Sequence, residues 1–485
     1  MTARMPDWLW HRAAVLGSHP AVITPDDTIS YAELEKRVTR LASALAAGGI
    51  SPGDRVALLA HNSLEFAVAA HAIPRAGAIF LPLNVRLKPE EMAWQLRRAG
   101  ARVVLSHAPT REAAREASSL AGLPAPLPLP LTRDVPPADL RTSHDPAGVH
   151  SIMYTSGTTG SPRAATLTFE NFWASAAGSA YNLGVDAGDR WLACMPLFHV
   201  GGLSILLRSA IYGTTAVIHP GFDEHAVNRA LRDDGITIVS VVATMLQRML
   251  DADDGDFPAT VRTVLVGGGP VPEALLRRAL ERGLPVVQTY GLTEAASQVA
   301  TLSPGDALTK LGSAGKPLVT TELRIDARPG EPGEILVRGA TLSPGYFGDP
   351  EATAQAIRDG WLHTGDIGRL DDDGYLYVLD RRDDLIVTGG ENVYPAEVEA
   401  VLVSFPGVSQ AAVVGLPDDQ WGRVVVAALV ASEPVDTDLI EAYLRERLAG
   451  FKVPRAFHLF SELPLTASGK VQRRLVREIL GGGGM

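Results

Sequence analysis

The segment from Tyr154 to Arg163 has the residue types that are needed to bind a phosphate group. Its sequence, Tyr-Thr-Ser-Gly-Thr-Thr-Gly-Ser-Pro-Arg, follows a strand-like run at 149–153. Glycines let successive backbone N–H groups point into one concavity, hydroxyl groups donate hydrogen bonds, and Arg163 supplies positive charge. The spacing to a Lys-Ser/Thr pair that marks the usual nucleotide loop is absent. Taken alone, the segment is more typical of a flexible turn, so other segments must decide its interpretation.

Four later segments carry further groups suited to nucleotide chemistry. They are Gly267-Gly-Gly-Pro270, Gln288-Thr-Tyr-Gly-Leu-Thr-Glu294, Trp361-Leu-His-Thr-Gly-Asp366 and Pro464-Leu-Thr-Ala-Ser-Gly-Lys470. Each also has a simpler interpretation: a sharp turn for the glycines, a turn before a helix for the second segment, and a surface residue for a lysine near the chain end. It is their combination and order along the chain that are specific.

In that combination and order, the segments resemble the motifs of the adenylate-forming superfamily of acyl-CoA synthetases, peptide-synthetase adenylation domains and luciferases. The resemblance covers nearly the whole chain. It implies an acid–CoA ligase that uses ATP and Mg²⁺, forms an acyl-AMP intermediate, and takes coenzyme A as co-substrate. Two positions depart from the family motif, because Arg163 stands where lysine is usual and Ala164 where glycine is usual. Arginine keeps the charge, but its planar guanidinium binds phosphate differently from an ammonium group.

The resemblance assigns a role to residues of each segment. It implies that Thr293 binds the α-phosphate, that Glu294 holds Mg²⁺, and that Lys470 is the catalytic lysine; a hard cation prefers oxygen ligands beside phosphates. Asp366 takes both ribose hydroxyls, because a carboxylate accepts two hydrogen bonds at once, and Arg381 also reaches the ribose. The other implied binding positions are Thr155, Ser156, Gly157, Thr158, Thr159, Gly160, Arg163, Gly268, Gly269, Pro270, Gln288, Thr289, Tyr290 (on the adenine) and Gly291, with Gly389 and Gly390 for the pantetheine arm of coenzyme A.

The run from Phe198 to Arg208 lies where the family builds its acyl pocket. The family has an aromatic–histidine pair beside the substrate and the thiol tunnel, which assigns His199 to the catalytic site, although a core histidine is the simpler interpretation. The wider stretch is similar to the branch that activates o-succinylbenzoate in menaquinone biosynthesis. The segments that carry this similarity are 195–213, 288–298, 311–317 and 378–384.

A dicarboxylic acid needs a polar anchor for the carboxylate that does not react, because a buried, unpaired charge is costly. The candidate anchors are Ser204, Ser297 and Gln298, and His199 and Gly268 complete the predicted acid site. Arg208 is a further candidate that is equally typical of a surface or interdomain residue. Another aryl or medium-chain acid remains an alternative substrate, and a stand-alone adenylation domain that loads a carrier protein remains an alternative function. A non-enzymatic binding protein is disfavoured, because Glu294, Asp366, Arg381 and Lys470 are all retained.

The elements that must position these groups follow an α/β pattern. Short apolar runs at 55–59, 78–81 and 102–105 predict buried parallel strands, and Ser30 and Glu33 predict a capped helix that Gly48 ends. The proline-rich stretch 123–130 predicts an extended connector, since proline interrupts a helix. A second α/β series spans about 149–299, with strands at 236–242 and 261–266, and a small β-rich unit follows residue 311.

The predicted domains are a large N-terminal body at 1–380 and a small α+β domain at 385–485 that carries Lys470. The resemblance implies that the small domain is mobile and that residues 381–384 form its hinge, with Asp383 at the hinge position. A chain of 485 residues exceeds one hydrophobic core. The body is expected to combine α/β subdomains with the β-rich unit, and the overall fold class is α/β.

The composition excludes several other classes of protein. The net charge of −11 disfavours nucleic acid as a partner, and one cysteine, Cys194, allows no intramolecular disulfide. Cys194 lies in an apolar run, which predicts a buried core residue. The chain has no apolar stretch of about 18 residues, so we expect no membrane insertion and a cytoplasmic enzyme. The partners are small molecules, and a homo-oligomer is left open.

Overall fold

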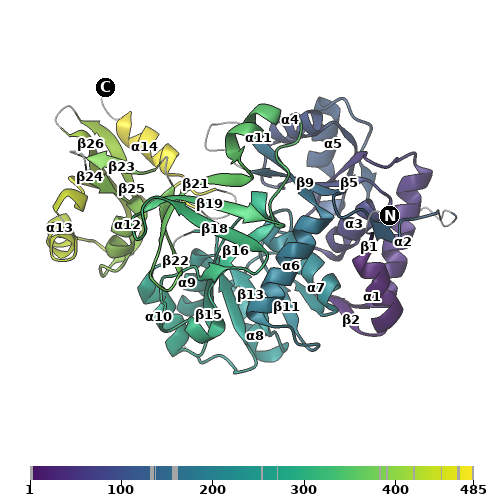
Figure 1. Ribbon diagram of the computed structural model, residues 1–485, viewed down its shortest axis with the longest axis horizontal. Helices are drawn as coiled ribbons and strands as arrows, with labels where there is room; N and C mark the ends of the chain where they lie inside the picture. Colours follow the sequence, from purple (N-terminus) through teal and green to yellow (C-terminus); the bar gives the residue numbers. More distant parts are fainter. Residues whose placement is uncertain are drawn as a thin grey trace.

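The computed structural model has a large body and a smaller C-terminal lobe (Figure 1). The described residues are 4–131, 136, 138–155, 162–252, 255–269, 271–381, 384–388, 391–418, 421–448, 450–466 and 470–482. Several predicted site residues lie outside them: Ser156, Gly157, Thr158, Thr159, Gly160, Pro270, Asp383, Gly389 and Gly390. In the described part of the chain, no helix is long and apolar enough to cross a membrane.

The first sheet of the body has six strands in the order β10-β9-β5-β4-β6-β7. The three predicted parallel strands are confirmed, as β4 (Arg55–Leu59), β5 (Ile79–Pro82) and β6 (Ala101–Ser106). The proline-rich stretch is extended as predicted, and it adds β7 (Leu127–Pro128) at the sheet edge.

The strand predicted at 149–153 is longer than expected and turns back on itself. β9 (Val149–Thr155) pairs with the antiparallel strand β10 (Arg163–Thr168), and Arg163 lies opposite Thr155. Tyr154, Thr155 and Arg163 are therefore strand residues at the end of a hairpin rather than residues of a free loop.

The second sheet has nine strands, and its central strands are parallel. In order they are β17 (Lys316–Pro317), β16 (Ser297–Thr301), β15 (Val286–Leu292), β14 (Thr263–Val266), β13 (Ile238–Val241), β11 (Arg190–Ala193), β12 (Thr215–Ile218), β2 (Pro20–Ile23) and β3 (Thr28–Ser30). The carboxyl ends of parallel strands share one edge, where α/β proteins bind their ligands. The segments that follow β11, β13, β14 and β15 all begin at this edge.

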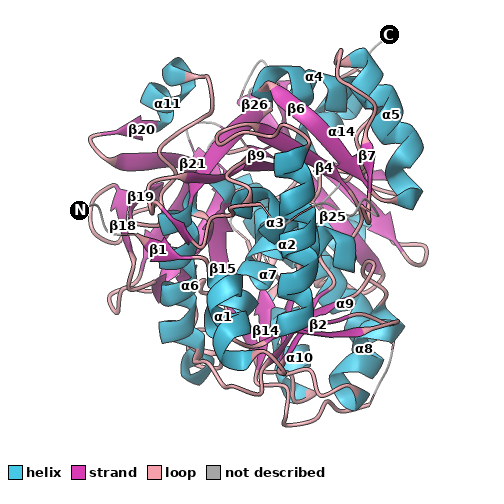
Figure 2. Ribbon diagram, turned by 90° about the vertical axis from the view of Figure 1, so that its right-hand side faces the viewer, coloured by secondary structure: helices cyan, strands magenta, loops and turns pink. Residues whose placement is uncertain are grey.

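Helices cover both sheets and fill the space between them. Figure 2 shows α2, α3 and α7 between strands of the two sheets, and one buried cluster joins residues of these helices with residues of both sheets. The helices of the body are α1 (Trp8–Leu16), α2 (Tyr31–Ala47), α3 (Leu64–Arg75), α4 (Pro89–Ala99), α5 (Arg111–Leu120), α6 (Phe169–Leu183), α7 (Val200–Tyr212), α8 (Glu224–Asp233), α9 (Ala243–Asp251) and α10 (Glu273–Glu281). Ser30 caps α2 and Gly48 ends it, as predicted.

The predicted β-rich unit and the C-terminal lobe complete the chain. The β-rich unit contains β18 (Thr321–Asp326), β19 (Gly333–Gly339), α11 (Pro350–Ala356), β20 (Ile357–Arg358), β21 (Trp361–Leu370) and β22 (Leu376–Arg381). The lobe contains β23 (Ile386–Thr388), β24 (Glu391–Val393), α12 (Pro395–Val403), β25 (Val408–Asp418), β26 (Gly422–Ala431), α13 (Thr437–Arg445), β27 (Ala456–Leu459) and α14 (Arg473–Gly481). Two hydrophobic clusters of the lobe consist only of its own residues.

A buried ionic cluster ties the N-terminal segment to the first α/β unit. Arg75 is 2% exposed, and its guanidinium contacts Asp7 Oδ1 at 2.5 Å and Glu35 Oε1 at 2.8 Å. Asp7 also lies 2.9 Å from His144 Nε2. Burial opposes ionisation of Asp7, but the hydrogen bonds from His144 and Arg75 and the charge of Arg75 outweigh it and hold the pKa of Asp7 well below its usual range.

Replacement of Arg75 by leucine should destabilise the body strongly. The variant leaves the Asp7 and Glu35 carboxylates buried without their cation, which typically costs about 3–5 kcal/mol. Arg37 provides a matched control, because its ion pair with Glu33 is half exposed and such pairs contribute less than about 1 kcal/mol. Urea unfolding followed by circular dichroism measures both effects. Equal losses of stability in Arg75→Leu and Arg37→Leu would contradict this account.

Candidate active site

A cavity of about 1380 Å³ lies at the edge where the parallel strands end. Its wall includes residues of both α/β units, of the β-rich unit and of the C-terminal lobe. The predicted site residues on this wall are Thr155, Arg163, His199, Gly268, Thr289, Gly291, Thr293, Glu294, Ser297, Gln298, Asp366 and Lys470. Gly269, Gln288, Tyr290 and Ser204 are described but do not line it. Residues separated by more than 300 positions thus share one cavity.

The end of β15 brings the predicted phosphate and magnesium residues to the cavity. At Gly291 the chain approaches β16 so closely that a Cβ atom would lie 1.7 Å from the Ser297 carbonyl oxygen, so only glycine fits there. A short 3₁₀ turn, Thr293–Ala295, follows directly and places Thr293 and Glu294 on the wall. The geometry explains why glycine precedes the hydroxyl and the carboxylate.

Tyr346 connects the predicted magnesium ligand with the cation of the hairpin. Its hydroxyl group donates a 2.9 Å hydrogen bond to Glu294 Oε1, and the guanidinium carbon of Arg163 lies 5.3 Å from its ring centroid. Burial raises the pKa of Tyr346, and the nearby charge of Glu294 raises it further, so the phenol stays protonated and donates. A planar guanidinium stacks on an aromatic ring. The arginine that replaces the usual lysine therefore has a specific partner.

The predicted ribose site is supported from three sides. Tyr290 Oη donates a 2.7 Å hydrogen bond to Asp366 Oδ2, and the backbone of Asp366 lies opposite that of Arg381 in the register of strands β21 and β22. Glu334 Oε1 accepts a hydrogen bond of 3.0 Å from the backbone N–H of Gly365, next to Asp366. Tyr290 is predicted to lie on the adenine; in the structure its hydroxyl group holds the carboxylate that is predicted to bind the ribose.

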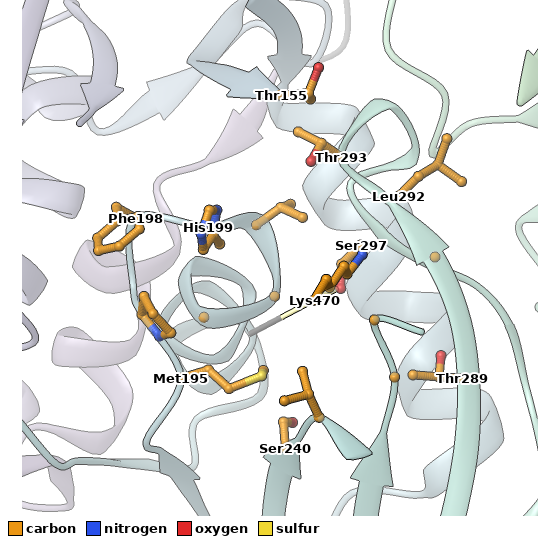
Figure 3. A pocket seen from close by; sticks show the side chains of 18 of the residues that line it. Thr155, Met195, Phe198, His199, Ser240, Thr289, Leu292, Thr293, Ser297 and Lys470 are labelled. Carbon is orange, nitrogen blue, oxygen red and sulfur yellow. The ribbon is translucent and has the colours of Figure 1, made fainter. Parts of the chain in front are cut away.

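Lys470 reaches the cavity from the C-terminal lobe. Figure 3 shows its side chain in the space between the Phe198–His199 segment and the strand that carries Thr289 and Leu292. A Cβ atom added at Gly268 would lie 3.6 Å from Lys470 Cε, so the lysine extends to the predicted glycine wall. The lobe therefore closes over the nucleotide end of the cavity.

His199 stands on the cavity wall as a neutral imidazole. Burial lowers the pKa of His199 to about 4, and the charges of Lys470 and Arg86 act in the same direction. His199 Nε2 is buried without a hydrogen-bond partner in the described structure. Phe198 packs beside it, with ring centroids 4.7 Å apart. A neutral histidine on the cavity wall with one ring nitrogen unpaired favours the site interpretation over a satisfied core histidine.

Asn62 fixes the segment that carries His199. No motif in the sequence indicates this role of Asn62. Its side-chain amide donates to the carbonyls of Met195 and His219, at 2.8 and 3.1 Å, and its oxygen accepts from Leu197 N at 2.8 Å. A lone asparagine after a strand carries no local signal for contacts more than one hundred residues away. Cys194, just before this segment, is buried as predicted, and burial raises the pKa of its thiol to about 12.

Arg208 is a buried residue of the cavity wall rather than a surface residue. It is 2% exposed, and its guanidinium donates to Ser175 Oγ at 2.9 Å and lies 5.6 Å from the Trp191 ring centroid. Its Nε has no partner, burial lowers its pKa, and the described residues provide it with no carboxylate. Burying an uncompensated cation is costly. The arrangement is suited to a ligand that brings a negative charge.

Of the predicted polar anchors, Gln298 and Ser297 face the cavity and Ser204 does not. Gln298 donates to Thr301 Oγ1 at 3.0 Å, and its Oε1 is buried without a partner. Ser204 Oγ is also buried without a partner, but Ser204 does not line the cavity, although it lies one helical turn before Arg208 on α7. Ser204 was predicted as a polar residue of the segment in which the family builds its acyl pocket, and that resemblance does not specify which side chains of α7 reach the cavity.

The oxygen ligands at the end of β15 fit a magnesium ion. Among the described residues no group of three or more His, Cys, Asp or Glu side chains could hold a metal, so a dedicated protein cage is absent there. Magnesium is usually bound through one or two carboxylates together with substrate phosphates. Glu294, next to the hydroxyl of Thr293, matches that donor set.

Comparison with known proteins identifies relatives over the full length of the chain. The model of the AMP-binding enzyme family matches residues 9–347, and that of the AMP-binding enzyme C-terminal domain matches residues 397–470. The chain is 46% identical to the 2-succinylbenzoate–CoA ligase of Geobacillus kaustophilus, covering 98% of both chains.

Two solved structures of a Bacillus subtilis enzyme have the same fold. The structure of its o-succinylbenzoate CoA synthetase in complex with the acyl-adenylate intermediate has a TM-score of 0.93, with 39% identity and 98% of both chains covered. The complex of that synthetase with ATP and magnesium has a TM-score of 0.92, with 39% identity, and covers 97% of this chain and 99% of the other. The arrangement of body and lobe therefore resembles that of an adenylate-bound enzyme.

Tyr346→Phe should weaken magnesium-dependent nucleotide binding while leaving the fold intact. The ring remains beneath Arg163, but Glu294 loses a hydrogen bond; hydrogen bonds to charged groups contribute about 1.5–3 kcal/mol. We expect the Mg²⁺ concentration for half-maximal binding of a non-hydrolysable ATP analogue to rise about tenfold or more. Isothermal titration calorimetry measures this binding without turnover.

Tyr375→Phe is the matched control for this experiment. It removes a similar hydrogen bond, from Tyr375 Oη to Asp306 Oδ2 at 2.8 Å, at a position away from the cavity wall. Its Mg²⁺ dependence should equal that of the unmodified protein. If both variants bind the analogue normally at low Mg²⁺, Tyr346 does not support the metal ligand.

Proposed function

The chain belongs to the AMP-binding enzyme family, and we propose that it is an ATP-dependent ligase that joins 2-succinylbenzoate to coenzyme A. The observation that carries this proposal is the cavity itself. It combines the nucleotide residues Thr293, Glu294 and Asp366 with Lys470 from the lobe and with the buried cation Arg208. Relatives named for the same activity cover the whole chain and support the choice of acid.

In the first half-reaction the acid carboxylate attacks the α-phosphorus of ATP, and pyrophosphate leaves. Two anions must approach each other, and their repulsion is strong where water is excluded. Lys470 and Arg163 supply positive charge, and Thr293 is positioned to donate a hydrogen bond to a phosphate oxygen. Glu294 would hold the magnesium ion, which neutralises phosphate charge when bound. Asp366, held by Tyr290, would orient the ribose.

In the second half-reaction the thiol of coenzyme A attacks the acyl-adenylate, and AMP leaves. We propose that the lobe, residues 385–485, turns about a hinge at 381–384 that includes Asp383, and so withdraws Lys470. The chain segment with Gly389 and Gly390 would then admit the pantetheine arm. Hinge motions of this kind exchange one half-site for another. We also propose that the enzyme works in the cytoplasm, where ATP and coenzyme A are both supplied.

The shape of the acid site supports a dicarboxylic substrate. His199 precedes helix α7 and Arg208 lies on that helix, and both residues line the cavity. An acid whose reacting carboxylate lies near His199 and Lys470 would direct its second carboxylate along α7. Arg208, Gln298 and Ser297 lie on the wall that it would meet. A fatty acid would leave the Arg208 cation without compensation.

Pyrophosphate release across a panel of carboxylic acids, with and without coenzyme A, tests the proposed function. We expect 2-succinylbenzoate to be the preferred acid and coenzyme A to be required for multiple turnovers. Preference for benzoate or a fatty acid would indicate that the protein is another aryl or medium-chain acyl-CoA ligase. Turnover with a carrier protein but not with coenzyme A would identify a stand-alone adenylation domain.

Lys470→Ala should abolish the first half-reaction and spare the second. Loss of a preorganised charged donor typically reduces such a step by about a hundredfold or more. Thioester formation from supplied 2-succinylbenzoyl-AMP and coenzyme A should stay within about twofold, because the lysine has left the site in that step. Pyrophosphate release and thioester formation are measured separately. A similar loss of rate in both half-reactions would contradict the assignment of Lys470 to the first half-reaction alone.

Arg208→Gln should weaken the use of 2-succinylbenzoate selectively. The ring carboxylate loses a charged partner, and such losses cost about 1–3 kcal/mol or more, which corresponds to about tenfold or more in kcat/KM. 4-Oxo-4-phenylbutanoate, which lacks the ring carboxylate, should be used almost equally by both proteins. Gln298→Ala should likewise lower kcat/KM for 2-succinylbenzoate more than kcat/KM for this analogue.

Ser204→Ala provides the control on the same helix, because Ser204 is buried but does not line the cavity. It should change the ratio of kcat/KM for the two acids by less than about threefold. If Arg208→Gln and Ser204→Ala change this ratio equally, Arg208 does not bind the second carboxylate.

A further inference from the structure

Arg473 forms the centre of a partly buried ionic cluster in the C-terminal lobe. It is the first residue of α14, and its guanidinium contacts Glu399 of α12 at 2.8 Å (Nε to Oε1) and 2.6 Å (Nη2 to Oε2). Its Nη1 donates to Asp384 Oδ2 at 3.1 Å. Arg477 adds a second contact, with its Nη2 3.7 Å from Asp384 Oδ1. One arginine thus joins three segments that are distant in sequence.

Asp384 belongs to the lobe side of the proposed hinge. β22, in the sheet of the body, ends at Arg381, and Ile386 is already part of the lobe's hydrophobic core. Asp384 lies between these two points and is held by two arginines of α14. The point at which the chain enters the lobe is therefore fixed to helix α14.

The same helix begins three residues after Lys470. Thr466 N donates to the Lys470 carbonyl at 2.7 Å, and Lys470 N donates to Thr466 Oγ1 at 3.1 Å. Gln472 continues this connection, because its backbone N–H donates to the Pro464 carbonyl and its side chain to the Leu465 carbonyl. Hydrogen bonds thus connect residues 464–466 with Lys470 and Gln472. Arg473, which holds Asp384, follows directly in the chain.

We propose that Arg473 is a positioning residue that holds the Lys470 segment and the entry of the lobe together as one rigid unit. This inference rests on the proposed function, in which the lobe rotates about the hinge between the half-reactions. A rotation at the hinge then carries Lys470 by a fixed amount, because the Asp384–Arg473–Glu399 contacts leave little freedom between them. Glu399 Oε1 also accepts from Val413 N at 2.8 Å, which ties the cluster to the central strand pair of the lobe.

The bidentate geometry explains why arginine stands at this position. Its planar fork reaches both oxygens of Glu399 and one oxygen of Asp384 together, which a single ammonium group cannot reproduce. The Arg473 side chain is only 14% exposed, so water competes weakly for these contacts. A displacement of about 1 Å at a catalytic group costs up to about a hundredfold in rate. A small loss of order in the Asp384–Arg473–Glu399 cluster would therefore displace Lys470 and lower the rate of adenylate formation.

The experiment compares Arg473→Gln with Arg474→Gln. Arg474 is the next residue, and its ion pair with Glu478 lies on the surface with 68% of the Arg474 side chain exposed. Both variants lose one positive charge from α14. The two half-reactions are assayed separately, and thermal unfolding reports whether the lobe remains folded.

Arg473→Gln should reduce kcat for adenylate formation about tenfold or more, with the KM for ATP changed less than about threefold. Thioester formation from supplied 2-succinylbenzoyl-AMP should fall by less than about threefold, because Lys470 takes no part in that step. Arg473→Lys should recover part of the lost rate, and Arg474→Gln should match the unmodified enzyme in both steps.

Three results would overturn the inference: normal adenylate formation by Arg473→Gln, equal loss in both half-reactions, or the same loss in Arg474→Gln. If Arg473→Gln does not fold, Asp384→Asn supplies the test, because it removes one partner of the cluster and should produce the same split. Failure of the proposed function is distinguishable, because the unmodified protein would then form no adenylate from 2-succinylbenzoate.

Discussion

Repulsion between two anionic reactants is the constraint on which this molecule depends. A carboxylate and a triphosphate repel each other more strongly as water is excluded, so cations must surround their meeting point. Three cations on the cavity wall come from different parts of the chain: Arg163 of the β9–β10 hairpin and Lys470 of the C-terminal lobe at the nucleotide end, and Arg208 of α7 at the proposed acid end. Of these three, Lys470 alone belongs to the C-terminal lobe, so the proposed rotation of the lobe would supply its charge for one step and remove it for the next.

The two departures from the family motif at 163 and 164 have a common structural setting. Both residues lie in strand β10, opposite Thr155 and Tyr154. Ala164 is buried in the hydrophobic cluster beside the first sheet, and Arg163 stacks on Tyr346. The methyl group of Ala164 adds packing that glycine would not provide. The guanidinium of Arg163 lies against the aromatic ring of Tyr346. The hairpin is thereby fixed at its base, next to the residue that holds Glu294.

Local signals in the sequence predicted much of the fold but less of the site. The Ser30 cap, the apolar runs of β4 to β6 and the β-rich unit depend on residues close in sequence, and they are confirmed. The pairing of β10 with β9, the three contacts of Asn62 and the burial of Arg208 depend on tertiary structure, and no short pattern encodes them. Motif resemblance predicted that distant residues share one cavity, but it did not specify that Ser204 of the acyl-pocket segment lies off the cavity wall.

The hydrophobic cores are compatible with the proposed rotation of the C-terminal lobe away from the cavity. Among the described residues, the clusters of the lobe contain only residues from 386 onward, and those of the body end at Val378. A rotation between them therefore separates no shared hydrophobic cluster, and burial of apolar surface is the largest favourable contribution to folding. In the proposed rotation, the contacts that change are mainly those between residues that line the cavity. Bound substrates contribute contacts there in each step. Differential binding of two ligand states is thus sufficient to select between two positions of the lobe.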